Sequence, residues 1–104
     1  MNILTKCTLL YYIEQYPLAA NSLQTWYDEL LRAKFHSFNE LKVMYGNASI
    51  IANNRVIFNI RGNHFRLIVH INFDAQTLYI IWFGSHSAYD KIDAANIKYV
   101  KRLN

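Results

Sequence analysis

The sequence predicts an α+β fold in which an N-terminal helix hairpin packs on one face of a small, mostly antiparallel β-sheet. Apolar residues recur with the helical period of about 3.6 in the first half and alternate with a period of two in the second. Only three Gly and one Pro occur in 104 residues, and no linker composition separates the halves. We therefore interpret residues 1–104 as one domain.

The first half is expected to contain a short strand and two helices. Residues 1–4 form the strand, and Thr5 occupies the N-cap position of the first helix. That helix ends before Pro17, because proline disfavours helical backbone at the residue preceding it. The second helix is expected over Ala20–Lys34 and carries one apolar stripe. The stripe consists of Leu23, Trp26, Tyr27, Leu30 and Leu31.

The second half is expected to be a meander of strands. A short third helix precedes it, starting at Phe38, because Ser37 to Glu40 has the spacing of a capping box. Turns are predicted at Asn53-Asn54, Gly62-Asn63 and Asp74-Ala75-Gln76, and Asn63 is expected to take the positive φ of its turn. The strands between these turns are 50–52, 55–60, 64–73 and 77–85.

The turn at Gly62-Asn63 sets the register of the first hairpin, because a two-residue loop places Asn59 opposite Arg66. In the same register Arg55 lies opposite His70. One face of the sheet then gathers the polar residues Arg55, Asn59, Arg61, His64, Arg66, His70 and His86. The other face buries Val56, Phe58, Ile60, Phe65, Leu67, Val69, Ile71 and Phe83 against the helices.

The turn at residues 74–76 sets the second register. A three-residue loop pairs Phe73 with Thr77, which places Arg66 opposite Gly84 and His64 opposite His86. The strand over 77–85 is almost continuously apolar, so we expect it to be covered on both faces.

The composition narrows the class of protein. Hydrophobic residues make up 53% and charged residues 17%, which excludes a disordered chain. The one Cys excludes a disulfide framework and a Cys-based zinc finger. The net charge of +4 and the 15% aromatic content favour a nucleic-acid ligand. No export signal or membrane-length apolar run is present, so a cytoplasmic protein without membrane contact is expected.

Arginine and histidine on one sheet face suit a phosphodiester ligand, because guanidinium groups grip phosphate oxygens in a bidentate way. RNA cleavage through the 2′-hydroxyl needs a base, a cation to stabilise the growing charge, and an acid for the leaving 5′-oxygen. Side chains can supply these roles without metal or cofactor, and the four His show no ligand spacing with a carboxylate. The competing interpretation is the ordinary solvated face of an antiparallel sheet.

Two segments carry a more specific signal. Residues 58–66 read Phe58-Asn59-Ile60-Arg61-Gly62-Asn63-His64-Phe65-Arg66, and residues 85–90 read Ser85-His86-Ser87-Ala88-Tyr89-Asp90. Together they resemble the central hairpin and the C-terminal motif of HigB-type toxins, members of the RelE-like superfamily of ribosome-dependent mRNA interferases. Tyr16-Pro17 between the helices, the spacing to Phe35 and the chain length agree with this resemblance, which extends across most of the chain.

The resemblance implies the toxin of a type II toxin–antitoxin system, an endoribonuclease that cuts mRNA in the ribosomal A site and blocks translation. It implies a HigA-type antitoxin with a helix-turn-helix domain as partner. Operator DNA is then bound only through the complex of the two proteins. The runner-up interpretation is a noncatalytic RNA- or partner-binding module of the same fold.

The resemblance also implies the site residues. Arg66 is the first candidate for stabilising charge in the transition state. His86 is a candidate acid or base, because an imidazole titrates near neutrality. Tyr89 is expected to stack on a base or orient a phosphate, and Arg61 is the fourth catalytic candidate. Their alternative roles are structural: a strand arginine that is solvated or paired with Asp90, a histidine that caps a turn, and a tyrosine that packs on the sheet.

A second set is expected to bind RNA without catalysing cleavage. It consists of Arg55, Asn59, His64 and Lys42. Basic side chains near the C-terminus, at Lys98, Lys101 and Arg102, are further candidates for phosphate contact. Such contacts add salt-dependent affinity without sequence preference.

Overall fold

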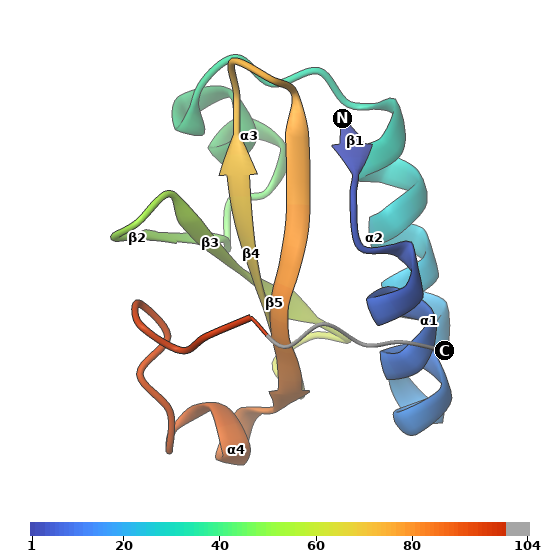
Figure 1. Cartoon of the computed structure of the whole chain (residues 1–104). Helices are drawn as coiled ribbons and strands as arrows, with labels where there is room; N and C mark the ends of the chain where they lie inside the picture. Colours follow the sequence, from blue (N-terminus) through green and yellow to red (C-terminus); the bar gives the residue numbers. More distant parts are fainter. Residues whose placement is uncertain (100–104) are drawn as a thin grey trace.

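A computed structural model of the chain describes residues 1–99, and Lys101 and Arg102 therefore lie outside the described residues. The two long helices of the N-terminal half stand on one side of a twisted sheet, as Figure 1 shows. This arrangement confirms the predicted α+β class. Within residues 1–99, no helix has the length and apolar character required to cross a membrane.

The N-terminal half forms the expected helix hairpin. β1 (Asn2–Ile3) leads into α1 (Lys6–Gln15), which ends before the 3₁₀ turn η1 (Pro17–Ala19). α2 (Ala20–Arg32) follows, two residues shorter than predicted. Thr5 is the N-cap residue of α1, but its hydroxyl does not cap the helix; it accepts a hydrogen bond from the Ile80 main-chain N–H at 2.8 Å. Thr5 therefore ties α1 to the sheet.

The apolar stripe of α2 faces the core over most of its length. Leu23, Trp26 and Leu30 are at most 3% exposed. Leu31 is 44% exposed, so its assignment to the buried stripe is wrong. A helix presents a stripe about 100° wide to a core, and Leu31 lies at the margin of that stripe.

The predicted capping box forms. Ser37 Oγ accepts a hydrogen bond from the Glu40 main-chain N–H at 3.3 Å and starts α3 (Phe38–Met44). The strands that follow are β2 (Ser49–Ile51), β3 (Arg55–Ile60), β4 (Phe65–Asn72) and β5 (Thr77–Ser85). The chain then enters α4 (His86–Tyr89), a single helical turn that the sequence analysis treats only as a motif after the last strand.

The five strands form one sheet in the order β1-β5-β4-β3-β2. Neighbouring strands are antiparallel except for β1 and β5. In the first hairpin Asn59 pairs with Arg66 and Arg55 pairs with His70, so this predicted register is confirmed.

The second hairpin has the predicted pairing at the end far from its turn, but the pairing next to the turn differs from the prediction. Thr77 pairs with Asn72 and not with Phe73, so the loop is one residue longer than expected. A β-bulge then places Ile68 opposite Trp82, two residues beyond the partner of Val69, Ile80. The extra residue in the bulge compensates for the longer loop, and Arg66 lies opposite Gly84 as predicted.

The main core fills the space between the sheet and the helices. All the strand residues expected on the helix-facing side belong to it. An aromatic cluster closes the end of this core next to α4: the Tyr16 ring lies 5.1 Å from that of Phe83 and 5.7 Å from that of Phe65, and the Phe65 and Phe83 rings stack at 5.4 Å.

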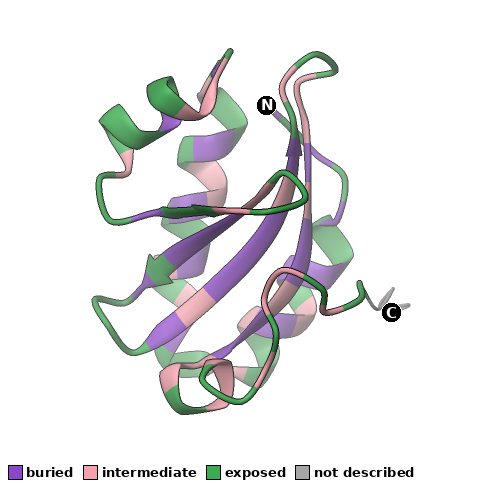
Figure 2. Cartoon of the chain, turned by 90° about the vertical axis from the view of Figure 1, so that its left-hand side faces the viewer, coloured by how far each residue is buried: buried purple, intermediate pink, exposed green. Residues whose placement is uncertain are grey.

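The opposite face of the sheet is also covered, as expected for β5, and this cover extends over part of the face of β3 and β4 that was expected to be polar. Ile57, Ile68 and Ile81 form a second cluster there, each at most 4% exposed. The segment after α4 runs across this face (Figure 2) and packs Ile92, Ala94 and Ile97 against the cluster. The polar face predicted from alternation is therefore open only where this segment does not lie.

Candidate functional site

The first candidate residue, Arg66, lies at the start of β4 with its guanidinium held from two directions. Nη2 donates to Asn63 Oδ1 at 2.6 Å, and Nη1 donates to the Asn63 carbonyl oxygen at 3.3 Å and to that of Phe65 at 3.1 Å. Its Cζ lies 5.9 Å from the centre of the Tyr89 ring. The side chain is half-buried, and these contacts fix the direction of the guanidinium while part of it stays open to solvent.

His86 is the first residue of α4, directly after the end of β5. Its main-chain N–H donates to the His64 carbonyl oxygen at 2.9 Å, which joins α4 to the start of β4. Its Nδ1 lies 3.2 Å from Asp90 Oδ2, and its side chain is 42% exposed. This contact orients the ring and leaves Nε2 as the nitrogen available to a ligand. The expected alternative pairing of Arg66 with Asp90 is replaced by the pairing of Asp90 with His86.

α4 owes its position to Ser85, whose Oγ accepts a hydrogen bond from the Ala88 main-chain N–H at 3.2 Å. At the other end of the turn, Tyr89 packs against the sheet, with its ring 6.3 Å from that of Trp82. Tyr89 thus contacts Arg66 on one side and Trp82 on the other. The structure brings Arg66, His86 and Tyr89 together at the same end of the sheet.

Gly84 makes room for this arrangement. It pairs with Arg66, and a Cβ built at this position would lie 2.6 Å from the Trp82 ring. A side chain at residue 84 would therefore displace the indole against which Tyr89 packs.

Arg61 does not join this group. It lies in the turn with φ of 54°, and it lines a groove between β3 and α2 together with Trp26 and Glu29. The expectation that Asn63 takes the positive φ is wrong, because Arg61 and Gly62 do so. The left-handed backbone at Arg61 turns its side chain away from the direction that strand alternation predicts. Arg61 as a catalytic residue stays a prediction.

His64 and Asn59 flank the group. His64 Nδ1 lies 2.9 Å from the Arg61 carbonyl oxygen, and the side chain is exposed. Asn59 is exposed on β3 directly opposite Arg66. Both residues border the same end of the sheet, where they could contact a bound strand of RNA.

Arg55 and His70 pair at the other end of the same face, where Arg55 contacts the C-terminal segment. Arg55 Nη1 donates to the Ala94 carbonyl oxygen at 2.8 Å, and Arg55 Nε is buried without a partner. His70 stacks on Tyr79 at 4.9 Å. Burial, together with the charge of Arg55, lowers the pKa of His70. A single continuous polar face is therefore wrong, although Arg55 as an RNA contact stays a prediction.

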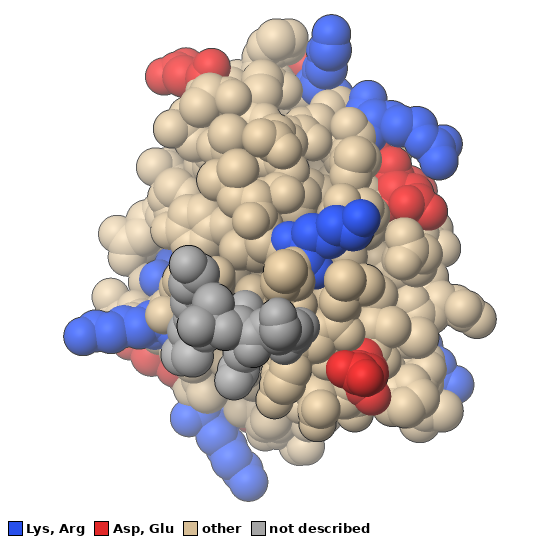
Figure 3. Space-filling view, turned by 45° about the vertical axis from the view of Figure 1, so that its right-hand side comes forward, with Lys and Arg blue, Asp and Glu red and all other residues tan. Residues whose placement is uncertain are grey.

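Lys42 is on α3. Its Nζ donates to the carbonyl oxygens of Gly46 at 2.8 Å and Ala48 at 2.6 Å, and so closes the turn after α3. Lys98 is exposed. Figure 3 shows that Lys and Arg are scattered on the surface it displays, with neutral residues between them. On the surface that Figure 3 displays, the positive charge does not gather into a broad patch.

Asn63 and Trp82 are the members of the site that sequence reasoning missed. Asn63 was assigned to the turn alone, yet its side chain braces Arg66. The signal that could have indicated this is the spacing, because a residue in the turn lies close to the residue three positions later. Trp82 is not in either motif, and only the bulge and Gly84 reveal its place beside Tyr89. Within residues 1–99, no group of three or more His, Cys, Asp or Glu could hold a metal ion.

Comparison with known proteins gives one family. The family model HigB_toxin, described as the RelE-like toxic component of a toxin-antitoxin system, matches residues 19–92. No curated protein matches the chain. The matched range begins in η1 and ends after α4, so it includes the sheet from β2 to β5 and every candidate residue described above except Lys98.

Proposed function

Since the chain belongs to the HigB family of RelE-like toxins, the toxic components of toxin–antitoxin systems, we propose that it is an endoribonuclease that cuts mRNA on the ribosome. Cleavage of mRNA during translation stops protein synthesis in the cytoplasm, where the ribosomes are. A HigA-type antitoxin neutralises the enzyme, and operator DNA is bound only by the complex of the two.

The observation that carries the proposal is the meeting of Arg66 and His86 at one end of the sheet. Arg66 pairs with Gly84, two residues before His86, and the His86 main chain is hydrogen-bonded to His64 at 2.9 Å. The backbone segments that carry the Arg66 guanidinium and the His86 imidazole are thus joined at the same end of the sheet. Fixed donors stabilise a developing charge better than mobile ones, because they need no reorganisation during the reaction.

The proposed reaction needs no group beyond the side chains and the RNA. A base removes the proton from the 2′-hydroxyl, and the 2′-oxygen forms a bond to phosphorus. The bond from phosphorus to the 5′-oxygen breaks, an acid gives that oxygen a proton, and the products are a 2′,3′-cyclic phosphate and a free 5′-hydroxyl. His86 serves as acid or base, and Asp90 holds its ring by the contact at Nδ1.

Arg66 stabilises the charge that grows on the phosphoryl oxygens. A guanidinium carries five N–H donors, and those not committed to Asn63 and Phe65 are available to phosphate. Tyr89 orients the guanidinium through its ring and offers its hydroxyl to the phosphate. Asn59 and His64, at the border of the site, contact the flanking RNA.

The experiment that tests the proposal maps mRNA 5′ ends after brief induction of the protein in growing cells. We expect new 5′ ends inside translated codons, and none in a matched reporter whose start codon is removed. Growth arrest should accompany cleavage and be relieved by co-expression of the antitoxin encoded beside the gene. If translated messages show no new ends while the protein accumulates in folded form, the noncatalytic binding module replaces this proposal.

A further inference from the structure

A hollow of about 450 Å³ lies along the outer edge of β5, between α1 and α4. Its walls are mainly the aromatic side chains Tyr11, Tyr12, Tyr16 and Trp82. Gln15 and Ala88 complete the rim from α1 and α4. Among the described residues, no charged side chain lines it.

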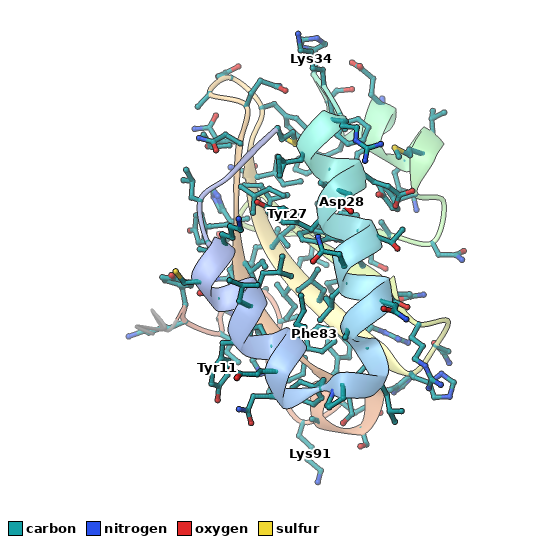
Figure 4. All side chains as sticks on the ribbon, turned by 90° about the vertical axis from the view of Figure 1, so that its right-hand side faces the viewer. Tyr11, Tyr27, Asp28, Lys34, Phe83 and Lys91 are labelled. Carbon is teal, nitrogen blue, oxygen red and sulfur yellow. The ribbon has the colours of Figure 1, made fainter. Side chains whose placement is uncertain are left out.

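The hollow exists because β5 has a partner strand on this side for only part of its length. β1 pairs with Thr77 and Leu78, and Thr5 Oγ1 accepts the N–H of Ile80. Beyond that point, within residues 1–99, α1 and not another strand stands beside the edge. In Figure 4 the Phe83 side chain lies between α1 and α2, whereas Tyr11 projects from the flank of α1 that faces away from α2.

The Trp82 ring is held in place at the wall of the hollow. It lies over Gly84, where a Cβ would come within 2.6 Å of the ring, and it packs against Tyr89 with 6.3 Å between ring centres. Trp82 is nevertheless half-exposed. A large flat ring that is fixed on one face and open elsewhere suits stacking by a planar ligand.

The hollow adjoins the candidate cleavage residues. Tyr89 contacts the Arg66 guanidinium at 5.9 Å and the Trp82 ring at 6.3 Å, and so lies between the two. Ala88, on the rim, belongs to the same helical turn that begins with His86. A chain of RNA held at Arg66 therefore passes within reach of the hollow.

We propose that this hollow binds a nucleobase of the RNA next to the cleaved phosphodiester and so helps to select the cleavage site. The inference rests on the proposed function, because the base belongs to the same substrate. Aromatic rings bind bases by stacking, and the Gln15 amide can hydrogen-bond to a base edge. Among the described residues, the lining carries no charge, which suits a neutral base.

The first test compares Tyr11→Ala with Tyr27→Ala by mapping 5′ ends. The two residues are matched, because both are half-buried tyrosines packed against the main core from neighbouring helices, and only Tyr11 lines the hollow (Figure 4). We expect Tyr11→Ala to reduce cleavage at the preferred sites roughly tenfold and to weaken the base preference at one position beside the cut. Tyr27→Ala should keep the wild-type pattern. An unchanged pattern in folded Tyr11→Ala contradicts the inference.

The second test is a direct binding measurement with short 2′-O-methyl oligonucleotides, which resist cleavage through the 2′-oxygen. The chain has two tryptophans, and Trp26 is 3% exposed, so quenching by a stacked base reports Trp82. We expect saturable quenching in the wild type and none in Trp82→Phe.

The two tests separate this inference from the proposed function. Cleavage of translated mRNA without quenching of Trp82, and without an effect of Tyr11→Ala, overturns the nucleobase site and leaves the endoribonuclease in place. Saturable quenching without any cleavage supports the site and overturns the endoribonuclease.

Discussion

Two cross-strand pairs on the same face of the β3–β4 hairpin differ in their surroundings. Asn59 pairs with Arg66 beside α4, and Arg55 pairs with His70 four residues away along β3. Arg66 is braced by Asn63 and Tyr89 and keeps an open side. Arg55 donates to Ala94 in the segment that crosses the sheet, and its Nε is buried.

The difference shows that strand alternation determines the face on which a side chain lies but not what covers that face. The two arginines have the same place in the pattern. One is held at a site open to a ligand, and the other anchors the C-terminal segment over Ile57, Ile68 and Ile81. We therefore expect substitutions at the α4 end to change chemistry, and substitutions at the covered end to change stability.

The largest effect is expected for Arg66→Ala. Loss of the guanidinium should reduce mRNA cleavage about 10²- to 10³-fold, as is usual for the loss of one donor to a developing charge. The free energy of unfolding should change by no more than about 0.5 kcal/mol, since the side chain is half-exposed. Quantitative 5′-end mapping measures the loss of cleavage, and denaturant unfolding measures the change in the free energy of unfolding. Arg32→Ala, an exposed arginine at the end of α2, is the control; undiminished cleavage by Arg66→Ala would remove Arg66 from the mechanism.

His86→Ala should reduce cleavage about 10²-fold, because it removes a proton-transfer group. Asp90→Asn should have a smaller effect in the same direction, since it keeps the side chain in place and weakens only the contact that orients the ring. The same cleavage assay compares the two variants. Full cleavage by a folded His86→Ala variant would show that another group transfers the proton.

Arg55→Ala tests the end of the sheet face on which the C-terminal segment packs. Loss of the hydrogen bond from Nη1 to the Ala94 carbonyl oxygen should lower the free energy of unfolding by about 1–2 kcal/mol. Limited proteolysis should cut more readily between residues 92 and 97 in this variant. Any loss of cleavage should be smaller than that of Arg66→Ala. A loss as large as that of Arg66→Ala in a fully folded protein would mean that the two ends act together on RNA.

The smallest expected effect is the pH dependence of the free energy of unfolding. Burial and the neighbouring Arg55 lower the pKa of His70 in the folded protein below its ordinary value of 6.5. The unfolded chain therefore binds more protons than the folded one just below pH 6.5, and stability falls as the pH drops through that range. The urea midpoint of the wild type should decrease between pH 7.5 and pH 5. In His70→Phe, which keeps a ring against Tyr79, the decrease should be smaller; an identical decrease would assign the effect to other groups.

The sequence predicted much of the fold because its signals are local. The helical stripe of Leu23, Trp26 and Leu30, the capping box at Ser37, and the turn that joins β3 to β4 depend on neighbours along the chain, although this turn extends over residues 61–64 and not over the two residues predicted. The same turn set the pairing of Asn59 with Arg66, and that pairing is present.

The bulge opposite Ile68 and Val69 was not predictable from the sequence, since it depends on how two strands meet over several residues. It nevertheless decides that Trp82 lies beside Tyr89 and that Gly84 faces Arg66. The place of Arg61 likewise followed from its left-handed backbone and not from its strand.

By itself the sequence determined which residues alternate between the two faces, where the chain turns and which family motifs it carries, because these properties depend on spacing along the chain. Only the tertiary structure decided that α4 and the start of β4 are joined beside Arg66, that Asn63 braces the guanidinium, and that the segment of Ile92 to Ile97 packs on the sheet and is bound by Arg55. These contacts join residues through packing in space, and no local period in the sequence records them.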